Sequence, residues 1–350
     1  MAPPRDPRVP GRRHRGGVPG PVPAAGFSRH VQVTKRSQSM KSAYDASRVD
    51  ERAGPVCSPD GSGGLACAEV KGGTQPAHDV IELPGLRGVL YSMPCEAPRG
   101  GDVHYLSVCG SGLLSRVCVA DVAGHGGAVA AISHETYDLL RRSVDVVDDR
   151  RVFRALDERL DRIDEPSLTT AVLATYFPPS RRLSISYAGH PEAWMFRRAE
   201  RRWRPIEAEP AAPKGASLVG LPLGTGLSPG FTRRRIKVEP GDRLLLLTDG
   251  VLEATSPDGV EFGQDRLEQV LRAHAGGCGE LVDELLAALR AHTGRERLIH
   301  DDVTIMVSEF VEGPRGPAIW HVIKNRLRPG RVEVAAVRPR HMPAAGPVAP

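Results

Sequence analysis

The order of apolar patterns along this chain restricts its fold more than any other feature. Apolar runs of strand length follow one another in blocks. Helical patterns come in pairs, near residues 128–140 and 152–163 and again near 264–275 and 279–292. Because strands and helices do not alternate, a parallel β-α-β sheet is not expected. The pattern predicts an α+β domain in which helices pack outside antiparallel sheets.

The runs of strand length are spread over the central two thirds of the chain. They lie at 88–93, 103–109, 116–120, 170–177, 183–187, 193–196, 231–238, 244–247 and 303–310. The run 244–247 consists of leucine alone, which is typical of a central strand covered on both faces. Gly110-Ser111-Gly112 predicts a hairpin turn between two of the runs.

The two ends of the chain differ from its middle in composition and charge. Residues 1–23 carry five arginines against Asp6, and residues 313–350 carry seven Lys/Arg against Glu333. The total of +5 therefore leaves −5 for residues 24–312. We expect a disordered basic leader over 1–82, a folded domain over 83–312 and a basic Pro/Arg/Ala-rich tail over 313–350. The tails lack interleaved aromatic residues, so no specific nucleic-acid partner is expected.

Cysteine usage and hydropathy favour a cytoplasmic protein. The six cysteines form no C-x-x-C pair, which argues against a zinc knuckle, an iron–sulfur cluster and a dense disulfide framework. We expect free thiols in a reducing compartment. No apolar run approaches the roughly 18 residues of a membrane span, and the N-terminal segment has no signal-peptide pattern.

Aspartates stand where predicted strands end or where glycines precede them, at Asp102, Asp121, Asp249 and Asp301 with Asp302. One such aspartate is commonly a turn or capping residue. Several that converge repel one another unless a cation lies between them. Oxygen donors alone favour Mg²⁺ or Mn²⁺, and the lack of a His/Cys cluster in the sequence argues against zinc.

The order of these motifs resembles the metal-dependent protein serine/threonine phosphatases of the PPM or type 2C superfamily, and most closely their bacterial SpoIIE-like branch. The matching segments run in family order over about two thirds of the chain: Gly100 to Asp102, Asp121 to Gly126, Thr169 to Ala174, Ala188 to Pro191, Gly220 to Gly224, Gly241 to Glu253 and Asp301 to Thr304. The resemblance implies an α-β-β-α sandwich of two mainly antiparallel sheets flanked by helices.

The resemblance also implies a site. Asp121, Asp249 and Asp301 match the carboxylates that hold two Mn²⁺ or Mg²⁺ ions, and the backbone carbonyl of Val122 matches a main-chain ligand. Asp102 resembles an outer carboxylate at the same ions. An activated water would then attack the phosphorus of a phosphoserine or phosphothreonine, and His125 is the candidate to protonate the leaving alkoxide.

One position departs from the family pattern, and two others are expected to have structural roles. Tyr105 occupies a position where the branch often has a second acid, which puts one metal contact in doubt. Gly250 is expected only to permit the turn after Asp249, and His190 is expected to be structural. The SpoIIE-like branch commonly acts on STAS-type anti-sigma-factor antagonists, so the resemblance implies a phosphorylated protein of that kind as partner.

Other enzyme classes fit the same residues less well. A haloacid-dehalogenase-type phosphatase has a nucleophilic aspartate at the position of Leu247. Leucine cannot be that nucleophile, so covalent aspartyl-phosphate chemistry is excluded at this site. Val103 and His104 follow the Gly100-Gly101-Asp102 motif, which gives poor support to a nucleotide cyclase of the GGD type. The sequence has no P-loop motif, so a P-loop NTPase is excluded. A catalytically impaired phosphatase-like binding or regulatory module remains the alternative, with Tyr105 as its best support.

Overall fold

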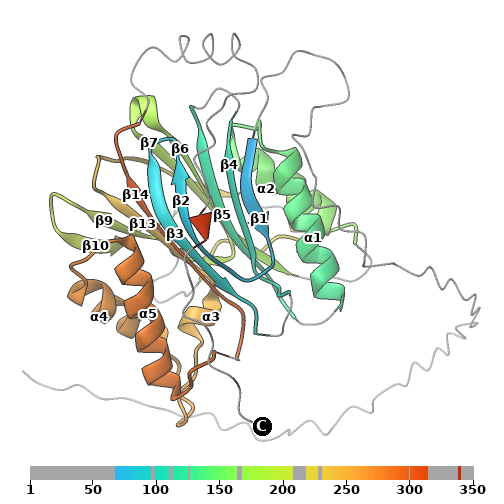
Figure 1. Cartoon of the computed structure of the whole chain (residues 1–350). Helices are drawn as coiled ribbons and strands as arrows, with labels where there is room; N and C mark the ends of the chain where they lie inside the picture. The colour runs from blue at the N-terminus through green and yellow to red at the C-terminus, as the bar shows by residue number, and fades with distance from the viewer. Residues whose placement is uncertain are drawn as a thin grey trace, which may run out of the picture. The chain divides into compact units, whose positions relative to one another are not determined.

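Two antiparallel β-sheets lie face to face in this protein, and helices cover their outer faces (Figure 1). The computed structural model describes residues 68–95, 99–109, 113–124, 127–163, 168–207, 218–227, 231–298, 300–313 and 338–339. Within these residues, the predicted α+β class and the α-β-β-α sandwich are confirmed.

The first sheet has six strands in the order β1-β4-β5-β6-β7-β12. Their bounds are β1 (Ala68–Gly73), β4 (Val103–Val108), β5 (Ser115–Val122), β6 (Thr169–Phe177), β7 (Arg182–Ala188) and β12 (Thr232–Lys237). Nearly every side chain of β4, β5 and β6 is buried. These strands are covered by helices on one face and by the second sheet on the other, which explains why their side chains are buried on both faces and are mostly apolar.

The second sheet has seven strands in the order β10-β9-β13-β14-β3-β2-β15. Their bounds are β2 (Ala77–Leu83), β3 (Leu86–Met93), β9 (Trp194–Arg197), β10 (Arg202–Pro205), β13 (Arg243–Leu247), β14 (Val303–Phe310) and β15 (Arg338–Pro339). The leucine run of β13 lies inside the sheet, between β9 and β14, as its composition predicted. A separate pair joins β8 (His190–Pro191) to β11 (Leu218–Val219), and Pro178–Ser180 forms one 3₁₀ turn.

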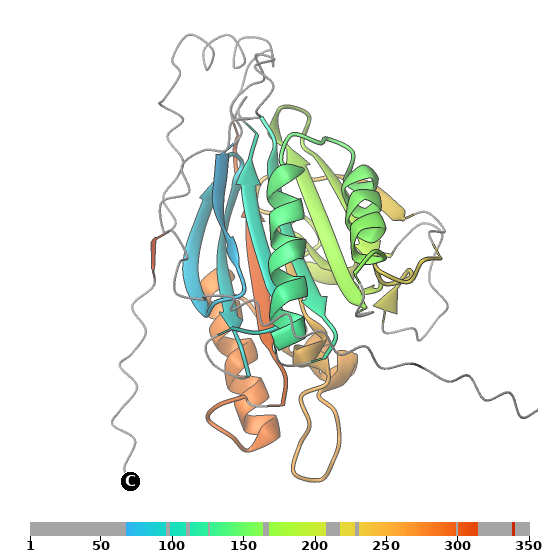
Figure 2. The same ribbon diagram turned by 90° about the vertical axis from the view of Figure 1, so that its right-hand side faces the viewer.

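The helices divide between the two outer faces. α1 (Gly127–Arg142) and α2 (Asp149–Leu160) cover the six-stranded sheet (Figure 2). α3 (Asp249–Leu252), α4 (Gly263–Ala273) and α5 (Cys278–Thr293) lie on the side of the seven-stranded sheet. On α2 the buried Val152, Leu156 and Leu160 recur at helical spacing, so the apolar pattern of the sequence is the face that meets the sheet.

Three apolar layers hold the sandwich together. One fills the space between the sheets and includes Leu106, Val119 and Met306. The other two lie under α1 and α2, around Phe153, and under the C-terminal helices, around Leu285. Full burial of one such side chain stabilises the fold by about 1.5–3 kcal/mol, so both sheets depend on their helices.

The folded region begins earlier than the sequence predicted. Strand β1 and all of β2 except Leu83 lie inside the segment 1–82 that was expected to be a disordered leader, so that boundary is wrong. The cause is Asp79, which occupies a buried position of β2 and breaks its apolar alternation. Lys71 of β1 pairs with Asp79 across the two sheets, a partnership that is invisible along the chain. Residues 1–67 lie outside the described residues.

The tail and the predicted hairpin turn are described only in part. The two residues of β15 lie in the predicted tail and pair with Asp79 and Val80 of β2. The turn Gly110-Ser111-Gly112 lies outside the described residues, although β4 and β5 on either side of it pair as expected. Among the described helices, none has the length and hydropathy needed to cross a membrane.

Candidate active site

Aspartates from both sheets meet at one edge of the sandwich. Asp121 lies in β5, and the register between β4 and β5 places Asp102 beside it. Asp249 opens α3 directly after β13, and Asp301 stands two residues before β14. The charges of Asp249 and Asp301 both act on Asp121. Four residues that are far apart in the sequence therefore share one site.

Hydrogen bonds between the sheets hold Asp102 in place. The hydroxyl of Thr248 donates to Asp102 Oδ2 at 2.9 Å and accepts the backbone N–H of Thr304 at 2.9 Å. Asp302 Oδ2 accepts the backbone N–H groups of Gly101 at 2.5 Å and of Asp102 at 3.2 Å. Thr248 and Asp302 flank strands of the seven-stranded sheet, so these bonds join the two sheets at the site.

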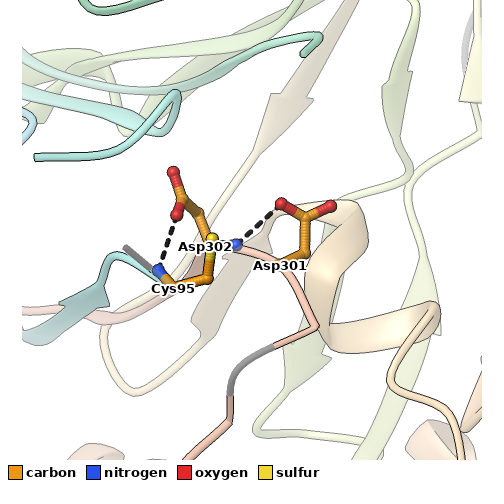
Figure 3. Close-up of side chains that lie close together, drawn as sticks. All are labelled: Cys95, Asp301 and Asp302. Atoms are coloured by element: carbon orange, nitrogen blue, oxygen red, sulfur yellow. Dashed lines mark hydrogen bonds between the residues drawn. The ribbon is translucent and has the colours of Figure 1, made fainter. Parts of the chain in front are cut away.

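Asp302 also anchors the segment after β3. Its Oδ1 accepts the backbone N–H of Cys95 at 2.7 Å, and its own N–H donates to Asp301 Oδ1 at 2.7 Å (Figure 3). Both carboxylate oxygens of this buried residue are thus engaged by backbone N–H groups. We interpret Asp302 as the residue that positions the loop carrying Asp102, because charged acceptors make the stronger hydrogen bonds.

A cysteine accompanies the acids, which the sequence did not indicate. The sulfur of Cys95 and carboxylate oxygens of Asp301 and Asp302 all lie within 4.8 Å of one another (Figure 3). More than 200 residues separate the cysteine from these acids. One thiol is still far from the cysteine-rich donor sets of structural zinc sites, so the oxygen-dominated character of the site stands.

Burial and mutual repulsion raise the pKa values of the central carboxyls. Burial, then Asp249 and Asp301, raise the pKa of Asp121 to about 8. Burial, then Glu253 and Asp301, raise the pKa of Asp249 to about 6. Each of these groups would be charged at neutral pH in water. The arrangement therefore stores electrostatic repulsion that a bound cation would relieve.

The outer acids follow the same trend. The pKa of the buried Asp102 is raised well above its usual range, first by burial and then by Asp121. Partial desolvation raises the pKa of Asp301 as well. Glu253, one helical turn after Asp249, has its pKa raised by burial and then by Asp301. Glu253 is a further acid of the site, beyond the five aspartates, that the sequence interpretation did not single out.

The backbone oxygen of Val122 faces the same place as the side chain of Asp121. A methyl group built on Gly101 would lie 2.7 Å from the Val122 carbonyl oxygen and 3.4 Å from Asp121 Oδ1. Both oxygens therefore converge on the surface of Gly101. Only a residue without a side chain lets these two oxygens lie so close to the backbone at position 101. Both are oxygen donors, which suit a hard divalent cation.

Gly250 has a different purpose from the predicted one. The residue lies within α3, and its φ is not in the left-handed region. A methyl group there would lie 2.0 Å from the backbone oxygen of Asp302. Gly250 is therefore required for close packing between α3 and the segment before β14, rather than for the turn after Asp249.

Three further predicted positions have different outcomes. His125 lies outside the described residues, so its role stays a prediction. Tyr105 is fully buried and packs edge-on against Tyr137, with ring centroids 6.3 Å apart, on the helix side of β4.

His190 is fully buried, and its Nδ1 lies 2.9 Å from Oγ1 of Thr170, which pairs with Asp121. Burial lowers the pKa of His190 to about 3, which fits the structural role predicted for this neutral imidazole.

The residues that sequence reasoning missed share one property. Thr248, Glu253 and Cys95 act through neighbours that are remote in the sequence or lie on the far side of a turn. Asp302 was identified as an acid at the strand end, but its bonds to Gly101 and Asp102 were not foreseen. The helical spacing between Asp249 and Glu253 was the one signal available in the chain itself. The predicted metal-ligand roles of Asp102, Asp121, Val122, Asp249 and Asp301 remain predictions, now with a shared location.

Comparison with known proteins agrees with this fold. The family described as Stage II sporulation protein E (SpoIIE) matches residues 114–311, more than half of the chain. Protein IcfG of Synechocystis sp. is 34% identical over 76 residues, which are 22% of this chain and 12% of IcfG. The aligned part is thus a small fraction of that relative.

Two solved structures resemble the fold. The crystal structure of the RsbU and RsbW domains of Rv1364c from Mycobacterium tuberculosis is 22% identical, with a TM-score of 0.51, and the match covers 68% of this chain and 64% of that one. The SiaA-PP2C domain of Pseudomonas aeruginosa is 21% identical, with a TM-score of 0.52, over 63% of this chain and 85% of that one. These likenesses show the architecture and not the activity.

Proposed function

The chain belongs to the SpoIIE family, and from that premise we propose that it is a metal-dependent protein serine/threonine phosphatase of bacterial signalling. The observation that supports this proposal most is the convergence of acids from both sheets. Asp102 and Asp121 come from the six-stranded sheet, whereas Asp249 and Asp301 come from the seven-stranded sheet. A purely structural scaffold would gain nothing from carboxyls that raise one another's pKa.

The protein's own groups divide into ligands and supports. Asp121, Asp249, Asp301 and the Val122 carbonyl would hold two Mn²⁺ or Mg²⁺ ions, with Asp102 beside them. The chemistry that such ions supply is the activation of water and the neutralisation of phosphoryl charge. Thr248 and Asp302 keep Asp102 and its loop in a fixed position before any substrate arrives, which is the preorganisation that catalysis needs.

The remaining parts of the proposal rest on the family resemblance. His125 would give a proton to the serine or threonine oxygen as it leaves the phosphorus. The substrate would be a phosphorylated protein, with a STAS-type anti-sigma-factor antagonist as the first candidate. The cysteines that the structure describes form no disulfide, which suits the cytoplasmic location expected for such signalling.

Hydrolysis of a phosphoserine peptide tests the activity. We expect release of phosphate in Mn²⁺ or Mg²⁺ and none in EDTA. Asp121→Asn and Asp249→Asn should each lower kcat/KM by more than about a hundredfold, because losing a ligand carboxylate weakens both ion affinity and charge stabilisation. The exposed Asp265 on α4 provides the matched control, and Asp265→Asn should retain full activity.

Two outcomes would contradict the proposal. Equal activity in EDTA and in Mn²⁺ would exclude metal dependence. A folded wild-type protein that binds Mn²⁺ but releases no phosphate from any phosphopeptide would favour the alternative, a catalytically impaired binding module. Thermal unfolding of each variant separates loss of activity from loss of fold.

A further inference from the structure

A cluster of arginines lies between α2 and the outer strand β12. Arg150, Arg151 and Arg154 occupy the exposed face of α2. Side chains alternate along a strand, and Arg233 bonds Asp148 at the start of α2. Arg235 therefore shares the face of Arg233 that looks toward α2. We call these five arginines the arginine cleft.

The cleft is hollow and has an apolar floor. It has a volume of about 310 Å³ and is lined by Arg150, Arg151 and Arg154 together with Asp148 and Phe231. The ring of Phe231 packs against Phe153 of the core, with centroids 5.4 Å apart. A pocket of this kind can receive a small apolar side chain at its base while charges are met at its rim.

One carboxylate already occupies part of the cleft. Asp148 lies 3.1 Å from Arg233 Nη1 and 3.3 Å from Arg150 Nη2. Hydrogen bonding to Arg150 is the main cause that lowers the pKa of Asp148. This internal pair shows that the cleft stabilises a charged carboxylate. Within the described part of the chain, Arg151 and Arg154 have no ion-pair partner of their own.

The cleft is separate from the acidic site. Asp149, at the start of α2, accepts a hydrogen bond from Thr175 at 2.6 Å. Thr175 stands five positions along β6 from Thr170, the residue paired with Asp121. Since a strand rises about 3.3 Å per residue, the cleft belongs to the opposite end of the six-stranded sheet.

We infer that the arginine cleft docks an acidic, extended segment of a protein partner. Five arginines against the single Asp148 leave a strongly positive surface that carboxylates complement. The strand β12 is last in its sheet, with no further strand beside it among the described residues. Its outer backbone groups suit the addition of an extended peptide, a mode in which pockets read alternate side chains.

A peptide fits this surface better than a nucleic acid does. Residues 24–312 carry a net charge of −5, so the excess of arginines in the cleft is not a property of this whole region. A long polyanion would extend beyond the cleft, whereas a segment of about ten residues would remain within it. Phe231 is the one aromatic residue among the described residues of the lining and packs against Phe153, so the cleft offers an apolar contact for one side chain rather than a row of rings on which successive bases stack.

Fluorescence anisotropy of the full chain with a labelled glutamate-rich peptide of about ten residues containing one leucine tests the inference. The charge-reversal variant Arg151→Glu/Arg154→Glu should weaken binding about tenfold or more, because two attractive pairs become repulsive. The control Arg202→Glu/Arg272→Glu makes the same charge change on β10 and α4 and should bind as the wild type does.

The alternatives give distinct results. Absence of peptide binding to the wild type, or equal weakening in both charge-reversal variants, would overturn the inference. So would single-stranded DNA of equal charge that binds more tightly than the peptide and is released by the same cleft variant. If the charge-reversal variant fails to fold, Arg151→Ala/Arg154→Ala should still weaken peptide binding about threefold.

Peptide binding requires no catalysis, so its outcome is independent of the proposed activity. In Mn²⁺, hydrolysis of para-nitrophenyl phosphate by the cleft variant should equal that of the wild type, because neither arginine touches the acidic site. Conversely, Asp121→Asn should retain peptide binding while losing hydrolysis.

Discussion

Individual positions at the site are determined by contact and not by charge alone. Gly101 is the clearest case, because a β-carbon at this position would meet two oxygens that are candidates to bind the same ion. No other residue type can occupy such an approach without moving a neighbour. The glycine is thus as much a part of the site as the carboxylates themselves.

Replacement of this glycine gives a sharp test. In Gly101→Ala the new methyl would lie 2.7 Å from the Val122 carbonyl oxygen, so the β4–β5 edge must shift. We expect the Mn²⁺ concentration for half-maximal activity to rise about tenfold, in line with other changes next to metal ligands. The thermal unfolding profile should stay cooperative.

Gly277→Ala is the matched control for that change. A methyl group at Gly277 meets no atom within 4 Å, and its φ of −91° suits alanine. The control should leave the Mn²⁺ dependence unaltered. An unchanged Mn²⁺ dependence in Gly101→Ala would show that the Val122 carbonyl does not contribute to ion binding.

Strands β1 and β2 are the elements that differ most from the sequence-based expectation. Their short, mixed sequences have no continuous apolar run, yet β2 lies between β3 and β15 and buries Ala77, Ile81 and Leu83. The buried charge of Asp79 is tolerated because Lys71 of the other sheet pairs with it. The charge buried in β2 thus depends on the partner that β1 supplies.

A truncation series follows from this arrangement. Deletion of residues 1–82 removes β1 and all of β2 except Leu83, and with them several apolar side chains worth about 1.5–3 kcal/mol each. This is a large part of the 5–15 kcal/mol typical of a domain. Cooperative thermal unfolding, measured by circular dichroism, should therefore be lost. Deletion of residues 1–60 leaves both strands and should preserve it, and a cooperative transition in the longer deletion would contradict their structural importance.

The molecule as a whole depends on what lies between its two sheets. That layer is largely apolar, but it also contains His104, which is fully buried on β4 near Lys71. Neither ring nitrogen of His104 has a hydrogen-bond partner among the described residues. Burial, then the charge of Lys71, lower the pKa of His104 to about 3.

This histidine makes the fold sensitive to acid. Its pKa is lower in the folded state than the unfolded value near 6.5, so the unfolded chain takes up the proton first. The stability from a neutral His104 is present above that value and is lost as pH falls toward 3. Between pH 7 and 5 the wild type should lose about 1–2 kcal/mol of unfolding free energy that His104→Leu retains.

Urea unfolding at several pH values measures this difference. The exposed His134 on α1 supplies the control, and His134→Leu should show the acid sensitivity of the wild type. Parallel pH profiles for His104→Leu and the wild type would mean that His104 is hydrated or already partnered in solution.

Much of the architecture could be predicted from local pattern. Strands β5, β6, β13 and β14 each contain a run of mostly apolar residues, and α2 and α5 carry helical periodicity, so neighbours along the chain specify them. The aspartates at strand ends were also identifiable, because an acid after a buried run stands at the edge of a sheet. These features need only the local sequence.

Partnerships between distant residues could not be derived in that way. The Lys71–Asp79 pair, the bond from Thr248 to Asp102 and the anchoring of Cys95 and Gly101 by Asp302 each join segments that only the stacking of the two sheets brings together. Local sequence determines which segments become strands and which of them end in an acid. Only the packed sandwich decides which acids face one another, because that choice depends on the register and stacking of sheets whose strands come from opposite ends of the folded region.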